Sequence, residues 1–237
     1  MRTEARGTSV IDSIVAVPFT TLASASMSHA SPLRPNASTG PSAAARPPIS
    51  AGILRSRYAL FAVLSIGGLF WDLWSKWAVF DWLKANNQHT VWKGIFLGIP
   101  IDFELATTFN HGALWGMGQG QTWLFASLSV LAIGVLVYFL WTGQAVESWW
   151  LTIVSGLLLA GTLGNLYDRL GLHGWKNDNG LQVYAVRDFL DFVFFNGGFH
   201  WATFNFADSY LVTGAIMLAL HSFRTPQNEP EKPKPVA

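Results

Sequence analysis

One stretch near the carboxyl end, Tyr184–Tyr210 (YAVRDFLDFVFFNGGFHWATFNFADSY), decides how the rest of the chain is interpreted. It places Asp188, Asp191 and Asp208 among aromatic and apolar residues, immediately before a hydrophobic run. A carboxylate is costly near a membrane, and a protein that keeps one there usually uses it. Two carboxyl groups that approach each other can share a proton and activate a water molecule. The first question is therefore whether Asp188 and Asp208 form such a pair.

The composition is that of a membrane protein. Of 237 residues, 51% are hydrophobic and only 12% are charged, and 12 tryptophans suit the aromatic belts at membrane surfaces. A net charge of +1, with no basic patch interleaved with aromatic residues, excludes nucleic acid as a partner. The absence of cysteine excludes disulfides, thiolate metal sites and cysteine nucleophiles. No histidine has a second ligand at metal spacing, so we expect neither a metal nor a cofactor.

The first 52 residues differ from the rest of the chain. Serine, alanine, threonine, proline and arginine dominate, and Ser31–Ser50 holds five prolines and no aromatic residue. Such a segment cannot bury enough apolar surface to offset its ordering entropy, so we predict disorder for residues 1–52. Residues 9–23 weakly resemble a signal peptide, although a charge and a proline interrupt the apolar run. A dispensable extension, or translation from Met27, is the favoured interpretation.

Four hydrophobic runs follow, each close to the ~20 residues that a helix needs to cross a bilayer. They cover residues 57–80, 123–141, 149–167 and 203–223. These runs predict an all-α membrane protein with four transmembrane helices. Basic residues precede the first run and follow the fourth, so the positive-inside rule predicts that both termini are cytoplasmic, including the tail 225–237.

With this topology, the polar residues of the hydrophobic region gather on the outer side of the membrane. They are Asp72, Lys76, Asn110, Asn165, Asp168, Arg169, Asp188, Asn205 and Asp208. Polar side chains within a membrane protein mark functional paths and sites. Their distribution therefore predicts a site at the outer membrane–water boundary.

Several of these residues also have a purely structural interpretation. Asp72 and Lys76, at positions i and i+4, are most simply a helical ion pair. Asp168 and Arg169 end the third run, where anchoring of the helix and support of a site are equally good interpretations. Asp191 is expected to be a solvated or capping acid in a loop.

The third and fourth runs contain two further informative spacings. Gly161 and Gly164 lie three residues apart, which is the small-residue spacing that lets membrane helices approach closely. Asn205 and Asp208 share one helix face, and either is a candidate cap of the fourth helix. Because Asp208 lies deeper in the run than a cap needs to, a functional role is the favoured interpretation for it.

The spacing leaves two function classes open. Two acids that converge with amides and an arginine can perform aspartic-type hydrolysis: one takes a proton from water while the other, protonated, polarises the scissile carbonyl. Acids within a membrane also serve proton relays and transport paths. The clustering on one face, with no midplane charge in the second and third spans, favours hydrolysis.

Five sequence blocks carry a resemblance to a known family. They are Asp72-Leu-Trp-Ser-Lys76, Asn110-His-Gly-Ala-Leu-Trp115, Gly161-Thr-Leu-Gly-Asn-Leu-Tyr-Asp-Arg169, Arg187-Asp-Phe-Leu-Asp191 and Phe204-Asn-Phe-Ala-Asp-Ser209. In this order the chain resembles lipoprotein signal peptidase, the type II signal peptidase of bacteria. The resemblance implies a four-helix aspartic endopeptidase of the inner membrane, covering residues 53–224, with a small extracytoplasmic β-cradle and a short amphipathic segment. Such an enzyme cuts diacylglyceryl-modified prolipoproteins on the amino side of the lipidated cysteine and needs no metal.

The resemblance also implies roles for single residues. Carried over by motif, Asp188 and Asp208 are the catalytic acids. Residues that line or orient the site are Asn110, Asn165, Arg169 and Asn205, and those that support it are Asp72, Lys76 and Asp168. The implied partners are prolipoproteins and membrane lipid, with no nucleic acid, and we expect a monomer.

Two departures from the family pattern concern the segment before the first catalytic acid. Arg187 replaces a small apolar residue, and would lower the pKa of Asp188 if it pointed toward that carboxyl. A polar insert at residues 173–180 (HGWKNDNG) lengthens the preceding stretch.

The outer segment between the first two spans is rich in aromatic residues and is expected to lie on the membrane interface. The candidates for that contact are Trp82, Trp92, Phe96 and Trp115, with plain belt anchoring as the alternative.

Overall fold

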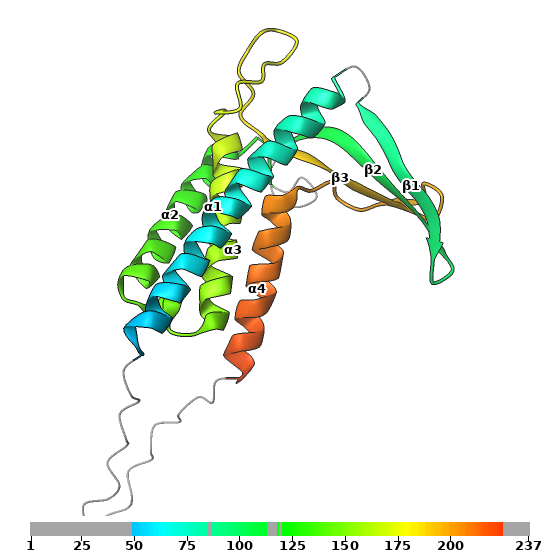
Figure 1. Ribbon diagram of the computed structural model, residues 1–237. Helices are drawn as coiled ribbons and strands as arrows, with labels where there is room; N and C mark the ends of the chain where they lie inside the picture. Colours follow the sequence, from blue (N-terminus) through cyan, green and yellow to red (C-terminus); the bar gives the residue numbers. More distant parts are fainter. Residues whose placement is uncertain (1–48, 85–86, 113–117, 119, 225–237) are drawn as a thin grey trace, which may run out of the picture. The chain divides into compact units, whose positions relative to one another are not determined.

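The computed structural model describes residues 49–84, 87–112, 118 and 120–224 (Figure 1). The helices are α1 (Ala51–Trp82), α2 (Thr122–Trp141), α3 (Trp149–Arg169) and α4 (Phe206–Arg224), with a 3₁₀ turn η2 (Gln144–Val146) before α3. The strands are β1 (Gln88–Phe96), β2 (Ile99–Asn110), β3 (Val186–Phe194) and β4 (Phe199–His200). All four helices are long and apolar enough to cross a membrane, which confirms the prediction of four spans.

Two helix boundaries differ by three or more residues from those expected from hydrophobicity. α1 begins six residues earlier than the hydrophobic run, because the Ser50 side chain caps it by accepting a hydrogen bond from the Ile53 N–H at 3.4 Å. α4 begins at Phe206 rather than at residue 203. The predictions for residues 1–48, for the tail 225–237 and for Trp115 lie outside the described residues.

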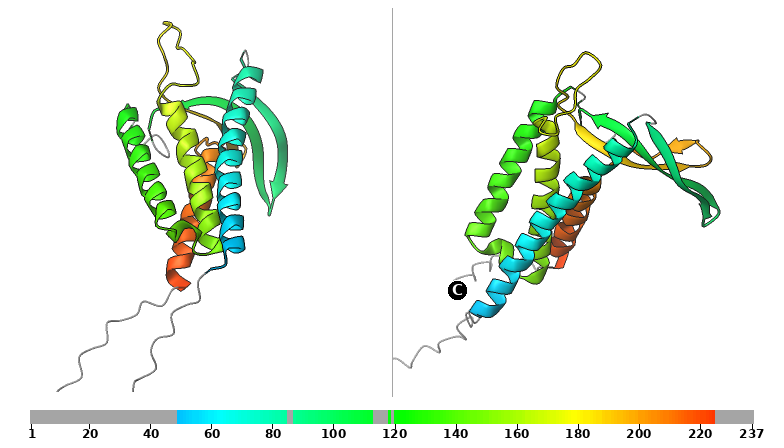
Figure 2. Two further views of the ribbon diagram at one scale, coloured as in Figure 1. Left: turned by 60° about the vertical axis from the view of Figure 1, so that its left-hand side comes forward. Right: turned by 45° about the horizontal axis from the view of Figure 1, so that its top comes forward.

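Helix α3 is the central helix of the bundle and packs against α1, α2 and α4 (Figure 2). Gly161 and Gly164 of this helix face α4 and α1 without a side chain. A Cβ on Gly161 would lie 2.5 Å from the Ala207 carbonyl oxygen, and a Cβ on Gly164 would overlap the Asp72 carboxylate. The close helix approach predicted from the Gly161–Gly164 spacing is therefore confirmed.

The four strands form one antiparallel sheet in the order β1-β2-β3-β4. β1 and β2 are joined by a two-residue turn at Leu97 and Gly98. Both residues have positive φ (51° and 80°), which lets the turn match the twist of the two strands. The sheet lies at the end of the bundle where α1 ends and α4 begins (Figure 1). Much of the segment expected to be a loop before α4 is therefore sheet, and it places Asp188 on β3 rather than in a loop.

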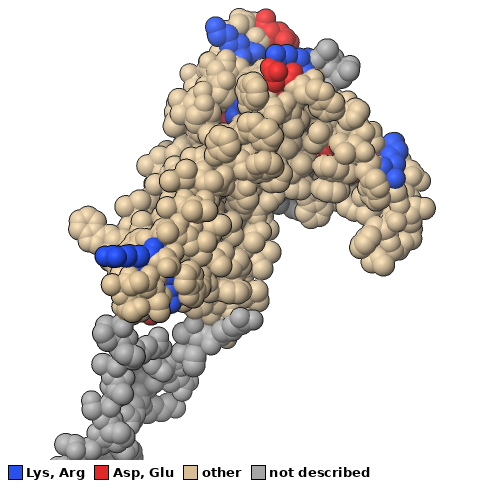
Figure 3. All heavy atoms as spheres, viewed as in Figure 1, with Lys and Arg blue, Asp and Glu red and all other residues tan. Residues whose placement is uncertain are grey.

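The opposite end of the bundle is tied together by Arg57 of α1. Its Nη1 donates hydrogen bonds to the backbone oxygens of Val146 (3.0 Å) and Glu147 (2.5 Å), and its guanidinium lies 5.5 Å from the centre of the Trp149 ring. In the view of Figure 3, the visible charged side chains lie at the two ends of the bundle and on the sheet, with a wide uncharged surface between. That surface suits the hydrocarbon layer of a bilayer.

The polar insert forms a hairpin above the end of α3. The Val183 N–H donates to the Trp175 carbonyl at 3.0 Å, and the Asn177 N–H donates to the Leu181 carbonyl at 2.8 Å. The Trp175 ring lies 5.8 Å from that of Phe80 on α1. The insert is thus anchored to the fold by one aromatic side chain, while its tip is exposed.

Candidate active site

Asn205 contacts both predicted catalytic acids. Its Nδ2 donates a hydrogen bond to Asp188 Oδ1 at 2.6 Å, and its backbone N–H donates to Asp208 Oδ2 at 3.2 Å. Asp188 lies on β3 and Asp208 in the first turn of α4, so the two acids meet where the sheet joins the start of the last helix. Both Asp188 and Asn205 are almost completely buried (1% and 0% exposed).

Asn205 and Asp208 also form the N-terminal cap of α4. The Asn205 Oδ1 accepts from the Asp208 N–H at 3.0 Å, while Asp208 Oδ2 accepts from the Asn205 N–H, so the two residues satisfy each other's backbone donors. The expectation that Asp208 lies too deep for capping was wrong, because α4 begins three residues later than hydrophobicity suggests. Capping leaves Asp208 Oδ1 available, and this oxygen accepts from Asn165 Nδ2 at 2.7 Å.

The surroundings of Asp188 favour the protonated form of its carboxyl group. Burial, and after it the charge of Asp208, raise the pKa of Asp188 to about 8. Hydrogen bonds from Asn110 Nδ2 (3.0 Å) and Asn205 Nδ2, together with the charge of Lys76, favour the ionised form but are outweighed. One carboxyl group of the site therefore holds a proton under conditions in which an aspartic dyad needs one.

A buried cluster of charges lies behind the two acids. Lys76 Nζ lies 2.7 Å from Asp72 Oδ2 and 3.2 Å from Asp168 Oδ2, and all three side chains are fully buried. Lys76 Nζ also donates to Asn165 Oδ1 at 3.2 Å. The Asp72–Lys76 helical pair is therefore confirmed, and Asp168 is more than an anchor at the end of α3 because it completes the cluster.

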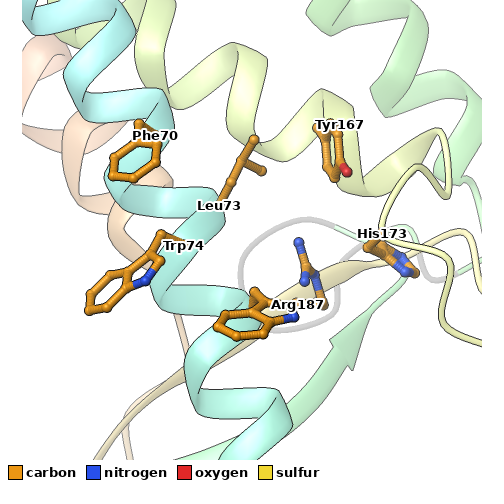
Figure 4. A pocket seen from close by; sticks show the side chains of 7 residues that line it. Phe70, Leu73, Trp74, Tyr167, His173 and Arg187 are labelled. Atoms are coloured by element: carbon orange, nitrogen blue, oxygen red, sulfur yellow. The ribbon is translucent and has the colours of Figure 1, made fainter.

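Arg187 points to Asp168 and not to Asp188. Its Nε and Nη2 donate to Asp168 Oδ1 at 3.1 and 2.8 Å, because successive residues of a strand face opposite sides of the sheet. A cavity of about 330 Å³ adjoins this guanidinium on the side of Trp74, Tyr167 and other residues of α1 and α3 (Figure 4). Because Arg187 does not point toward Asp188, the condition for its expected effect on the pKa of that carboxyl is not met, and burial and the charge of Asp208 raise this pKa instead.

Arg169 lies on the other side of α3, within electrostatic range of both Asp208 and Asp188. Its Nη2 donates a long hydrogen bond to the Gly112 carbonyl at 3.5 Å, and its guanidinium lies 5.5 Å from the centre of the Phe125 ring on α2. Arg169 therefore links the surroundings of the two acids to α2 and to Gly112. The contact with Phe125 had no signal in the sequence, since nothing in α2 distinguishes this phenylalanine.

Asp191 does not belong to the site. It lies in β3, paired with Glu104 of β2, and only 6% of the residue is exposed. Its Oδ2 lies 3.6 Å from His200 Nδ1. Being three residues from Asp188 in a strand, it faces the other side of the sheet. Burial raises the pKa of Asp191. The expectation of a solvated or capping loop acid was wrong, because the segment is a strand.

Comparison with known proteins identifies the family. A family model described as signal peptidase II matches residues 64–224. The chain belongs to the signal peptidase II family. It is 42% identical over 171 residues to the lipoprotein signal peptidase of Rhodopirellula baltica, covering 71% of this chain and 73% of the relative. It is 30% identical over 179 residues to the lipoprotein signal peptidase of Vibrio cholerae, and this match covers 71% of this chain and 95% of the relative.

A solved bacterial membrane enzyme shares the fold of this signal peptidase. The TM-score is 0.51 at 22% sequence identity, and the match covers 73% of this chain and 93% of the other. The family expected from the five sequence blocks is confirmed, and with it the class of enzyme, an aspartic-type signal peptidase. In the part of the chain that the structure describes, the architecture is four helices apolar enough to span a membrane, with a small antiparallel sheet.

Proposed function

We propose that this signal peptidase removes signal peptides from diacylglyceryl-modified prolipoproteins, on the amino side of the lipidated cysteine, and that Asp188 and Asp208 activate the attacking water. The observation that carries the proposal is the junction at Asn205, which donates hydrogen bonds to both acids, while burial raises the pKa of Asp188. Membership of the family, and the names of the relatives, support the substrate class.

In this mechanism, the Asp208 carboxylate takes a proton from a water molecule whose oxygen attacks the scissile carbonyl carbon. Asp188 gives its proton to the carbonyl oxygen, which receives the electron pair of the broken π bond. When the tetrahedral intermediate collapses, the carbon–nitrogen bond breaks and the leaving nitrogen takes the proton held by Asp208. Asp188 recovers a proton from a hydroxyl of the intermediate, so both acids return to their starting states.

The surrounding side chains have positioning roles in this proposal. Asn165 and Asn205 hold Asp208 by hydrogen bonds to both of its oxygens, and Asn110 holds Asp188. A cavity of about 200 Å³ is lined by mainly apolar side chains of α2 and α4, and by Thr162, Asn165 and Arg169 of α3. It adjoins the acids through Asn165, which donates to Asp208, and its apolar side suits an apolar part of a membrane-bound substrate.

The same proposal assigns a location. We place the four helices in the bacterial inner membrane, with both termini cytoplasmic and the acids at the extracytoplasmic face. The start of α1 carries Arg55 and Arg57, which provide the positive charge expected on the cytoplasmic side. The acids lie at the opposite end of the bundle (Figure 1). A lipid-anchored substrate can then reach the site while its acyl chains stay in the bilayer.

The dyad is tested by Asp188→Asn and Asp208→Asn, each measured in the full chain with a synthetic diacylglyceryl prolipoprotein peptide in detergent. Both variants should lose cleavage while keeping the protein level and the unfolding temperature. Asp178→Asn is the matched control, since this acid lies on the exposed tip of the insert hairpin and should keep full activity. Residual cleavage in either dyad variant at a rate close to that of the control would refute the mechanism. Loss of an ion flux with intact cleavage would instead indicate transport.

A further inference from the structure

The backbone on the amino side of each dyad acid is held by a different buried carboxylate. Asp72 Oδ1 accepts a hydrogen bond from the N–H of Ala207, the residue before Asp208, at 2.8 Å. Asp168 Oδ2 accepts from the N–H of Arg187, the residue before Asp188, at 3.0 Å. Each of these two carboxylates thus fixes the backbone N–H of the residue that directly precedes one of the acids.

Lys76 joins the two carboxylates into one unit. Its ammonium group lies within ion-pair distance of both Asp72 (2.7 Å) and Asp168 (3.2 Å), with no exposed side-chain surface on any of the three. Because the three are charged −1, +1 and −1, the unit has one negative charge in excess. Buried charge without a partner is strongly unfavourable, so this unit needs another cation.

Arg187 supplies that cation. Its guanidinium donates from Nε and Nη2 to one oxygen of Asp168, and its side chain is only 4% exposed. Among the described residues that line the adjoining cavity, Arg187 is the one with a permanent charge, and Asp168 is the carboxylate that it contacts (Figure 4). Arg187 therefore holds Asp168 twice, through the side chain and through the backbone N–H.

We propose that Arg187 is a positioning residue for peptide cleavage, which fixes the backbone of β3 on Asp168 so that the adjacent Asp188 side chain meets Asp208; this inference rests on the proposed dyad. Neighbouring side chains of a strand point in opposite directions, so anchoring Arg187 on one face sets the direction of Asp188 on the other. A displacement of reacting groups by about 1 Å can reduce a rate by about 100-fold.

The test compares Arg187→Met with Lys93→Met, measuring cleavage of a synthetic diacylglyceryl peptide by the full chain in detergent. Both changes remove one positive charge from the sheet. Lys93, however, is exposed on β1 and pairs with Asp102, outside the buried cluster. Arg187→Met should lower kcat by about 10- to 100-fold with KM changed less than about twofold, because substrate contacts are intact and only the acids are misplaced. Lys93→Met should retain the kcat and KM of the unchanged chain.

Two further variants separate positioning from a general loss of folding. Arg187→Lys keeps the charge and the backbone hydrogen bond but cannot make the two-pronged contact, so it should fold and lose about threefold in kcat. In an Asp168→Asn background, Arg187→Met should cost less than about threefold more, because Arg187 would act through the group already removed.

A wild-type kcat in folded Arg187→Met or in Arg187→Lys would overturn the inference, as would an undiminished loss in the Asp168→Asn background. These outcomes differ from a failure of the proposed function. In that case the unchanged chain would not cleave the peptide, or the Asp188→Asn variant would still cleave it.

Discussion

Replacing Asn110 with alanine should move the alkaline limb of the rate–pH profile to higher pH. The Asn110 Nδ2 donates to Asp188 Oδ2 at 3.0 Å, and this bond favours the ionised carboxylate, which the proposed mechanism cannot use. A hydrogen bond to a charged group contributes at least about 1.5 kcal/mol, which corresponds to a pKa shift of about one unit. Since the pKa of Asp188 is about 8 with the bond present, its loss should shift the midpoint of the limb upward toward about pH 9.

The same substitution should lower the maximum rate, because the Asn110 Oδ1 also accepts from the Gly112 N–H at 2.9 Å and shapes the segment beside the acids. The assay is the initial rate of cleavage of a diacylglyceryl peptide, measured between about pH 6 and about pH 10 at saturating substrate. Asn179→Ala, at the exposed tip of the insert hairpin, is the control and should reproduce the original profile. A limb that stays in place or moves to lower pH in Asn110→Ala would refute the role of a protonated Asp188.

Two substitutions test the buried supports of the site. Lys76→Met should lower the free energy of unfolding by about 3–5 kcal/mol, because it leaves the buried Asp72 carboxylate without a counter-charge, whereas Asp168 keeps its pairing with Arg187. Thermal unfolding in detergent measures this, and a loss below about 1 kcal/mol would contradict it. Gly164→Ala should lower both the unfolding temperature and the cleavage rate, because its Cβ would displace the Asp72 carboxylate from the N–H of Ala207. A variant with normal cleavage would show that this contact is dispensable.

Hydrophobicity and charge spacing were sufficient to predict the four spans and the Asp72–Lys76 pair. Both depend on local rules, since a bilayer requires about 20 apolar residues and a helix brings residues four apart together. The close approach at Gly161 and Gly164 was predictable for the same reason. The convergence of Asp188, Asn205 and Asp208 was expected from topology and from the family motifs.

The sequence was least informative where tertiary contacts decide the outcome. The true start of α4 depends on the reciprocal contacts of Asn205 and Asp208, and hydrophobicity cannot distinguish a helical residue from the extended one before it. Asp191 was misassigned because β3 becomes a strand through pairing with β2, far away in sequence. The partner of Arg187 could not be read from its neighbours in the chain, because strand alternation turns it away from Asp188 toward α3.

The double use of Asn205 restricts how this position can vary during evolution. For capping alone, serine or aspartate would serve as well as asparagine. Serine has too short a side chain to replace the amide that reaches Asp188, and an ionised aspartate would lack the Nδ2 donor and add a third carboxylate beside the two acids. Selection for a more stable start of α4 and selection for turnover therefore act on the same side chain, the first through its Oδ1 and the second through its Nδ2. An amide at residue 205 is the side chain that satisfies both, so we expect a search for stabilising replacements at this position to yield inactive proteins.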